Sequence, residues 1–284
     1  MAMFLYINGD FIDQKKAVIS PLDHGYLYGL GVFETLRTYR GVPFLLEEHI
    51  YRLNAGLKEM GINQTLQTDA VSKIIRELSV LNGLKDSYIR INVSAGVGNI
   101  GLQTDTYTDP TFILFQKELP DADQLREKEA VILTLRRNTP ESGFRLKSHH
   151  FFNNAAAKRE IGPGAEKEGI FLSQDGYLAE GITSNLFWVN GGVLYTPSLE
   201  TGILNGITRQ FVMRLASETG IPIKEGVYRK SVLNEAEEIF FTNSIQEISP
   251  VRTFHGRRLP GKKGSFTQVL NKLYQEFICS VVSQ

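Results

Sequence analysis

Short glycine-containing turns that join two strand-like runs recur along this chain of 284 residues, and they constrain its fold more than any other feature. An Asn-Gly or Asp-Gly pair favours a tight hairpin turn, whose central residues take positive φ angles. Hairpins connect antiparallel strands, whereas parallel strands need long crossover connections, usually helices. Such turns outnumber the candidate crossover helices, so the pattern predicts an α+β fold rather than a regular βαβ winding. The turns lie at Asn8-Gly9, Arg40-Gly41, Asp175-Gly176 and Gly191-Gly192.

A polar and charged stretch, KELPDADQLREKE at 117–129, separates two of these mixed patterns and contains Pro120. We therefore expect a small N-terminal α+β domain at 1–118 and a larger C-terminal α+β domain at 129–284, joined by a linker at 119–128. Helices are predicted where apolar residues recur three or four positions apart. These stretches are 47–61, 68–83, 207–219 and 266–282.

The charge balance argues against one class of function. Lys and Arg total 31, as do Asp and Glu, so the formal net charge is zero. A chain that binds nucleic acid through a broad phosphate footprint is normally basic, so we expect no nucleic-acid partner. The N-terminal MAMFLYINGDF lacks the basic start and continuous apolar run of a signal peptide, and no uncharged run is long enough to span a bilayer. We expect a cytoplasmic protein with no membrane partner.

Metal chemistry has little support in the sequence. The single cysteine, Cys279, cannot form an internal disulfide or a thiolate cluster, and its apolar setting LYQEFICSVV predicts a core position on a terminal helix. His149 and His150 are adjacent, so they point to different sides of a strand or helix and cannot chelate one ion together. We expect no metal site.

The run GVGNIG at 96–101 matches the dinucleotide fingerprint G-x-G-x-x-G and follows a predicted strand. That motif also needs a helix whose N-terminus meets the pyrophosphate. The next residues, LQTDTYTDPTFILF, are polar, β-branched and interrupted by Pro110, so no helix is expected there. A glycine-rich loop is favoured over a dehydrogenase site, which stays the alternative from another enzyme class.

A second glycine precedes a helix that is clearly predicted. Asn205-Gly206 stands where the cap of the helix at 207–219 belongs. An ordinary capped surface helix explains this pattern by itself. A glycine there also lets a phosphate approach the free N–H groups of Ile207 and Thr208, and the helix dipole favours such an anion.

Three charged residues gain meaning only in combination. A lysine such as Lys147 forms covalent adducts with aldehydes when its setting lowers its pKa. Glu180 lies between strand-like runs and Arg52 lies on a predicted helix; by default both are solvated surface charges. A lysine for an aldehyde, a carboxylate for a pyridinium nitrogen, and a helix start with an arginine for a phosphate are together what pyridoxal 5′-phosphate requires.

The sequence resembles the fold-type IV pyridoxal-phosphate enzymes nearly from end to end. This family comprises branched-chain aminotransferases, D-amino-acid transaminases and 4-amino-4-deoxychorismate lyases. The resemblance implies two α+β domains with the cofactor between them, and a homodimer. It is carried, in this order, by DHGYLYGLGVFETLRTY, EEHIYRL, FRLKSHH, AEGITSNLFW, TPSLETGILNGITR and FFTNSIQEISPV.

The resemblance also implies a role for each matching residue. Lys147 corresponds to the family's Schiff-base lysine and would be the catalytic residue. Glu180 corresponds to the acid that bonds the pyridine nitrogen. The positions that bind the phosphate correspond to Arg52, Ile207, Thr208 and Ser244.

The positions expected to face the substrate separate the branches. D-amino-acid transaminases carry a tyrosine where this chain has Phe33, and branched-chain aminotransferases commonly carry one where it has Phe152. The run RRNTPESGFRLKSHHFFNN is most similar to aminodeoxychorismate lyases of Gram-positive bacteria. The resemblance therefore implies a lyase that takes the small molecule 4-amino-4-deoxychorismate, removes pyruvate and leaves 4-aminobenzoate, a folate precursor. An aminotransferase acting on branched-chain or D-amino acids is the alternative, and Tyr28 and Arg90 are candidates for holding substrate carboxylates.

Overall fold

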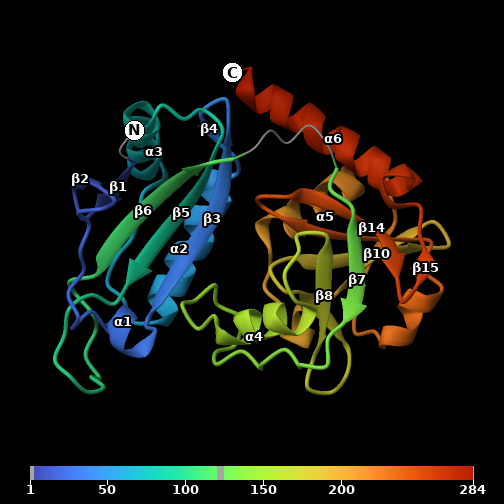
Figure 1. Ribbon diagram of the computed structural model, residues 1–284, viewed down its shortest axis with the longest axis horizontal. Coiled ribbons are helices and arrows are strands. Elements are labelled where there is room, and N and C mark those ends of the chain that lie inside the picture. Colours follow the sequence, from blue (N-terminus) through green and yellow to red (C-terminus); the bar gives the residue numbers. More distant parts are fainter. Residues whose placement is uncertain (1–2, 120–124, 284) are drawn as a thin grey trace. The chain divides into compact units, whose positions relative to one another are not determined.

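The computed structural model describes residues 3–119 and 125–283 and divides the chain into two compact units (Figure 1). Unit 1 comprises Met1–Asp121 with Leu146–His150, and unit 2 comprises Ala122–Arg145 with Phe151–Ser283. Residues 120–124 of the expected linker lie outside the described part of the chain. Each unit mixes helices and sheet, which agrees with the predicted α+β class.

Unit 1 is built on a six-stranded antiparallel sheet in the order β2-β1-β6-β5-β3-β4. Helices α2 and α3 pack on it (Figure 1), and one core joins Val32 and Leu36 of β3 to Leu53 of α2 and Ile75 of α3. The predicted hairpins at Asn8-Gly9 and Arg40-Gly41 are present as β1–β2 and β3–β4, with positive φ at all four residues. The elements are β1 Phe4–Ile7, β2 Asp10–Asp13, α1 His24–Tyr28, β3 Gly31–Tyr39, β4 Val42–Pro43, α2 Leu46–Glu59, α3 Thr68–Asn82, β5 Ser87–Ser94 and β6 Thr111–Glu118.

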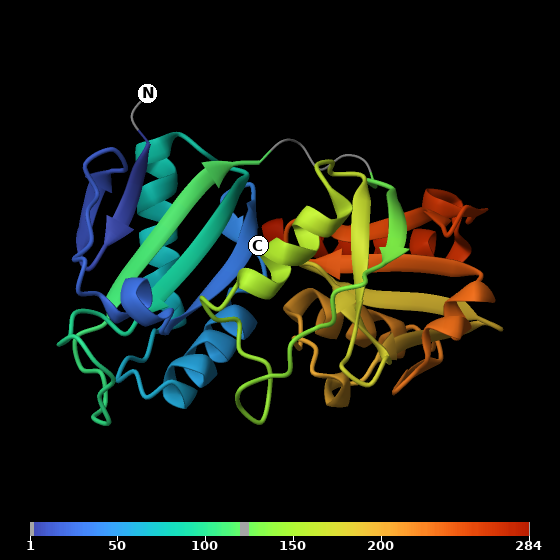
Figure 2. The same ribbon diagram turned by 60° about the horizontal axis from the view of Figure 1, so that its bottom comes forward.

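Unit 2 is built on a nine-stranded mixed sheet, whose path β12-β11-β10-β13-β14-β7-β8-β9 is joined by β15 at β14. Helix α4 contacts β8 (Figure 2), and α5 contacts β13 and α6. Its elements are β7 Lys128–Ile132, α4 Phe152–Ile161, β8 Lys167–Leu172, β9 Leu178–Gly181, β10 Asn185–Asn190, β11 Val193–Pro197, α5 Ile207–Glu218, β12 Ile223–Gly226, β13 Glu238–Asn243, β14 Glu247–Phe254, β15 Arg257–Arg258, α6 Ser265–Val282, and three short 3₁₀ turns at Leu199–Thr201, Lys230–Asn234 and Gly261–Lys263.

The segment that carries Lys147 groups differently from the sequence-based expectation, which placed it in the C-terminal domain. Leu146–His150 belongs to unit 1 because it pairs with the start of β3. The Phe33 N–H donates to the Lys147 carbonyl at 2.8 Å, the His149 N–H donates to the Gly31 carbonyl at 2.9 Å, and Ser148 bridges to Val32. Long-range strand pairing of this kind leaves no signal in the local sequence.

Two smaller expectations have different outcomes. No helix follows the glycine-rich run at 96–101, as predicted, so the dinucleotide-binding geometry is not formed. Cys279, expected in the core, is exposed. The buried face of α6 repeats every four residues through Leu270, Tyr274 and Ile278, and Cys279 lies about 100° around the helix from the last of these. No helix in the described residues is long and apolar enough to cross a membrane.

Candidate functional site

The predicted site residues fall into two groups, one on each unit. Unit 1 carries Lys147, Arg52, Tyr28 and Arg90, and unit 2 carries Glu180, Ile207, Thr208 and Ser244. Each group has a local geometry of its own, and the roles assigned to these residues remain predictions.

Lys147 lies beside a buried aromatic ring. Its backbone is fixed to β3 by the pairing described above, and its Nζ is 4.7 Å from the ring centroid of Phe33. The Arg90 guanidinium from β5 lies 3.7 Å from the same centroid. Phe33 is only 3% exposed, and both cations lie over its ring, where burial strengthens cation–π attraction. The ring therefore holds together a predicted catalytic amine and a predicted substrate-binding arginine.

Arg52 is held by a buried carboxylate. Its Nε and Nη2 donate to the two oxygens of Glu34, at 2.6 and 2.8 Å, and His49 Nδ1 donates to Glu34 Oε2 at 2.6 Å. His49 and Arg52 are three residues apart on α2, so both side chains reach the same strand. A guanidinium gripped through two of its nitrogens has a fixed direction, which suits a residue that must meet a phosphate.

Electrostatics in this cluster follow from burial and charge. Burial alone would raise the pKa of Glu34, but the charge and hydrogen bonds of Arg52 and His49 outweigh it and hold that pKa far below its usual value. Burial lowers the pKa of His49, although Glu34 opposes the shift, so His49 serves as a neutral donor. Sequence reasoning missed Glu34 and His49. The spacing of His49 and Arg52 on one predicted helix was the available signal.

His149, two residues after Lys147, has an unusual environment. Its ring packs so closely on Gly31 that an added Cβ there would lie 2.3 Å from the imidazole Cε1. Its Nε2 is buried and has no hydrogen-bond partner in residues 3–119 and 125–283. Burial, together with the charge of Arg90, lowers the pKa of His149 to about 4. The imidazole is therefore neutral near pH 7.

The two candidate substrate residues have modest local contacts. The Tyr28 hydroxyl accepts a hydrogen bond from the Gly101 N–H at 2.6 Å, so the glycine-rich loop docks on it. Arg90 Nε donates to Asn92 Oδ1 at 3.2 Å.

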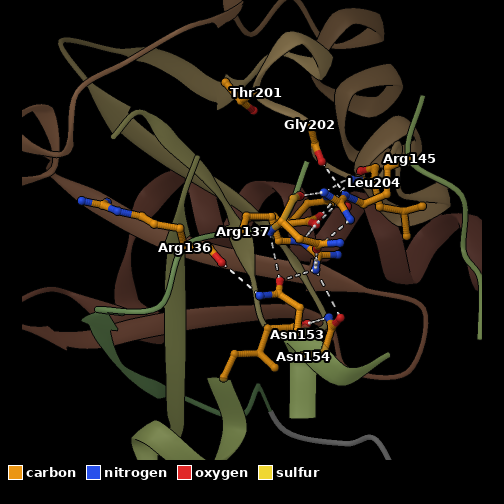
Figure 3. A network of polar contacts seen from close by, with 12 residues as sticks. Arg136, Arg137, Arg145, Asn153, Asn154, Thr201, Gly202 and Leu204 are labelled. Carbon is orange, nitrogen blue, oxygen red and sulfur yellow. Dashed lines mark hydrogen bonds and ion pairs between the residues drawn. The ribbon is translucent and has the colours of Figure 1, made fainter. Parts of the chain in front are cut away.

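Glu180 belongs to a buried polar network in unit 2 with Arg137, Arg145 and Leu204, which are labelled in Figure 3. Arg137 Nε donates to Glu180 Oε1 at 2.8 Å, and the Leu204 N–H donates to Oε2 at 3.0 Å. Arg145 Nε lies 3.7 Å from Oε1. The carboxylate, 5% exposed, is surrounded by hydrogen-bond donors and two guanidinium groups.

The network extends from Arg137 to the start of α4. Arg137 Nη1 donates to the Oδ1 atoms of Asn153 at 2.7 Å, Asn138 at 3.0 Å and Asn154 at 3.3 Å. The sequence gives no separate signal for a role of Asn153 and Asn154, and sequence reasoning missed Arg137 and Arg145. The run RRN and the later Arg145 differ little from ordinary polar loops, so only the fold reveals that they converge.

The predicted phosphate-binding residues also meet. Ile207 and Thr208 open α5 as expected, and Thr208 Oγ1 lies 3.3 Å from Ser244 Oγ. A Cβ at Gly206, the residue before the helix, would lie 2.0 Å from Asn185 Oδ1, which itself belongs to the wall of this turn. Glycine is therefore required by close packing, and the free N–H groups of the first helical turn are bordered by two hydroxyl groups.

The chemistry of these donor sets fits pyridoxal phosphate. A buried carboxylate matches a protonated ring nitrogen, and a helix start with two hydroxyl groups matches a phosphate. Lys147 supplies the amine that an aldehyde needs.

Comparisons with known proteins agree with this chemistry. The family model for class IV amino-transferases matches residues 31–254. The aminodeoxychorismate lyase of Bacillus subtilis (strain 168) is 44% identical over 282 residues, which cover 99% of this chain and 96% of that protein.

Solved structures are also similar. The branched-chain aminotransferase of Thermoproteus uzoniensis with norvaline has a TM-score of 0.89 at 29% identity, covering 98% of this chain and 95% of that one. The T.th. branched-chain aminotransferase complexed with N-(5′-phosphopyridoxyl)-L-glutamate has a TM-score of 0.85 at 27% identity and covers 98% and 94%. With a family model that spans most of its length and a full-length relative of this similarity, the chain belongs to the class IV aminotransferase family of pyridoxal-phosphate enzymes.

Proposed function

We propose that this protein is a lyase that converts 4-amino-4-deoxychorismate to 4-aminobenzoate and pyruvate. The observation that carries the proposal is the 44% identity to the Bacillus subtilis aminodeoxychorismate lyase along 99% of the chain. A second observation supports it: the buried residue beside Lys147 and Arg90 is Phe33, where the D-amino-acid branch of the family has a tyrosine.

The reaction needs one proton removed from the ring carbon that bears the amine, one C–O bond broken, and one proton added to the departing enolpyruvyl group. No oxidant, reductant or water is consumed. Bound pyridoxal phosphate supplies a ring that accepts the electrons left by deprotonation. Aromatisation of the product makes the elimination favourable.

Each residue then has a defined task. Lys147 would hold the cofactor aldehyde through its Nζ and would take the ring-carbon proton at the same atom. Glu180 holds the proton on the pyridine nitrogen. Arg90 and Tyr28 hold substrate carboxylates. The phosphate is held by Arg52, by the N–H groups of Ile207 and Thr208, and by the Ser244 hydroxyl.

The test is product release by purified protein loaded with pyridoxal phosphate. We expect 4-aminobenzoate, measured by chromatography, and pyruvate, measured with lactate dehydrogenase, in equal amounts. Borohydride reduction followed by peptide mapping should place the cofactor on Lys147. Lys147→Ala should abolish both results, and Lys73→Ala, at a side chain that is 73% exposed, should leave them unchanged. Absence of 4-aminobenzoate from the loaded wild type would exclude the lyase.

An aminotransferase is the second candidate, because branched-chain aminotransferases superpose on this chain with a TM-score of up to 0.89. An amino donor alone should then remove the visible absorbance of the cofactor, and a branched-chain keto acid should restore it. A lyase ends each turnover with the absorbance unchanged, so this measurement separates the two candidates.

We further propose that the enzyme acts on its small-molecule substrate as a homodimer in the cytoplasm, as the family resemblance implies. Sedimentation equilibrium of the loaded protein tests the dimer, since a monomer mass at micromolar concentration contradicts it. Cell fractionation tests the location.

A further inference from the structure

Glu180 faces two arginines, and the second one is not needed to satisfy it. Both Glu180 oxygens already accept hydrogen bonds, one from Arg137 Nε and one from the Leu204 N–H. Arg145 Nε nevertheless lies 3.7 Å from Oε1, and the side chains of Arg145, Arg137 and Glu180 are only 8%, 8% and 6% exposed. Two positive charges therefore surround one negative charge in a poorly solvated place.

Arg145 is held there by backbone carbonyls. Its Nε donates to Gly202 O, its Nη2 donates to Asn138 O, and its Nη1 donates to Asn138 Oδ1 at 3.3 Å. These bonds join the loop before Lys147 to the turn that delivers the Leu204 N–H (Figure 3). A neutral donor could make bonds of this kind, so they explain the position of the side chain but not its charge.

The charge of Arg145 carries an energetic cost. Burial and the charge of Arg137 lower the pKa of Arg145 to about 10, while Glu180 and the exposed Glu141 oppose that shift. The guanidinium thus stays cationic near neutral pH. Like charges buried together are retained where something uses their field.

We propose that Arg145 is a positioning residue that acts beside Glu180: its positive charge opposes a second positive charge on the cofactor's pyridine nitrogen and so makes that nitrogen release its proton more readily. The assignment rests on the role of Glu180 in the proposed function. A cation near a protonated nitrogen disfavours the charged form of that nitrogen and lowers its proton affinity. A ring that loses its proton more readily spends less time in the protonated form that accepts electrons, so Arg145 sets how strongly the enzyme drives deprotonation.

The experiment is a pH titration of the visible absorbance of bound pyridoxal phosphate, without substrate. Arg145→Gln removes the charge and should raise the midpoint of the absorbance change by about one pH unit, as expected for a charge several ångströms away at an effective dielectric constant near 20. Arg145→Lys keeps the charge and should titrate close to the wild type. Asn138→Ala removes one anchor of Arg145 but no charge, and it should not move the midpoint.

Arg136 provides the matched control. It is the exposed neighbour of Arg137, and its side chain extends away from the network in Figure 3. Arg136→Gln makes the same change in net charge and should leave the midpoint unchanged. An unchanged midpoint in Arg145→Gln overturns the proposal. A shift in Arg145→Lys or in Arg136→Gln as large as that in Arg145→Gln also overturns it.

The titration separates this proposal from the proposed reaction. A shifted midpoint in a protein that releases no 4-aminobenzoate supports the role of Arg145 and contradicts the lyase. Product release together with an unshifted midpoint supports the lyase and contradicts the role of Arg145. A wild type with no visible cofactor band contradicts both.

Discussion

Two buried glutamates, one in each unit, are held by arginine in contrasting ways. Within the described residues, Glu34 takes its side-chain partners from one helix, as His49 and Arg52 both lie on α2. Glu180 takes its partners from irregular segments, through Arg137, Arg145 and the Leu204 N–H. The first arrangement is local and repeats a helical spacing, whereas the second exists only when distant loops come together.

The two sites also differ in charge. Around Glu34 one carboxylate meets one guanidinium and a neutral imidazole, so the charges balance. Around Glu180 one buried carboxylate meets two buried guanidinium groups, and Glu141, which also acts on Arg145, is exposed, so the buried charges leave a surplus of one positive charge. A balanced buried pair serves mainly to fix geometry, whereas a surplus charge changes the protonation of a group bound beside it. We therefore infer structural support for the Glu34 site and, in line with the proposal for Arg145, an effect on the protonation of a bound ligand for the Glu180 site.

The largest expected effect comes from removing the single arginine of the balanced site. Arg52→Gln leaves the fully buried Glu34 without its compensating charge, so we expect the free energy of unfolding to fall by about 3–5 kcal/mol. Chemical denaturation of the apoprotein measures this change. Glu77→Gln, which breaks the exposed pair with Lys73, should cost less than about 1 kcal/mol. A cost for Arg52→Gln as small as that of the surface control contradicts the structural role.

His149 sharpens the comparison, because burial depresses its pKa and no carboxylate of the described residues is hydrogen-bonded to its buried Nε2. Its pKa is 6.5 in the ordinary state and about 4 in the folded protein. Between these values the unfolded chain binds the proton more readily, so acid favours unfolding and stability rises as the pH is raised from 4 to 6.5. His149→Gln should remove up to about 3 kcal/mol of that rise.

Denaturation midpoints measured across this pH range test the prediction. His49 has a lowered pKa in the same direction, so the wild-type slope contains both histidines and only the difference between proteins counts. His150→Gln, at an exposed position, controls for the loss of a histidine. A His149→Gln protein with the wild-type slope contradicts the neutral imidazole.

The surplus site should respond more weakly to the same substitution. Arg145→Gln loses donors to Gly202 O and Asn138 O, but it also relieves the repulsion between Arg145 and Arg137. We expect the free energy of unfolding to fall by about 1–2 kcal/mol, less than half of the Arg52→Gln effect. Equal losses at the two sites would remove the distinction drawn from charge balance.

Much of the fold could be predicted from the sequence, since its signals are local. The hairpins at Asn8-Gly9 and Arg40-Gly41 follow from turn chemistry, and α5 begins at Ile207 because Gly206 precedes a helical apolar pattern. The grouping of the Lys147 segment with unit 1 could not be predicted. It depends on a bridge between Ser148 and Val32, which are more than a hundred residues apart in the chain.

The candidate site divides in the same way. Motif resemblance predicted site roles for Lys147, Glu180 and Arg52, because each lies in a short recognisable run. It could not identify Glu34 or Arg145, whose importance comes from contacts across the fold with Arg52 and Glu180. A motif thus predicts which residue meets a ligand, whereas the residues that orient it emerge only from packing.

The smallest expected effect concerns the hydroxyl pair at the start of α5. Thr208→Val keeps the shape of the side chain but removes the hydroxyl that lies 3.3 Å from Ser244 Oγ, so we expect a loss of about 1 kcal/mol in unfolding free energy. If the hydroxyl also binds the phosphate, the affinity for pyridoxal phosphate should fall by about tenfold, measured by equilibrium dialysis.

Thr219→Val is the matched control, since its hydroxyl bonds Leu215 O at the other end of the same helix. A double-mutant cycle with Ser244→Ala should show that the two hydroxyls do not contribute independently, because they act on one anion. Additive losses, or an equal loss of affinity in Thr219→Val, would contradict a phosphate at the start of α5.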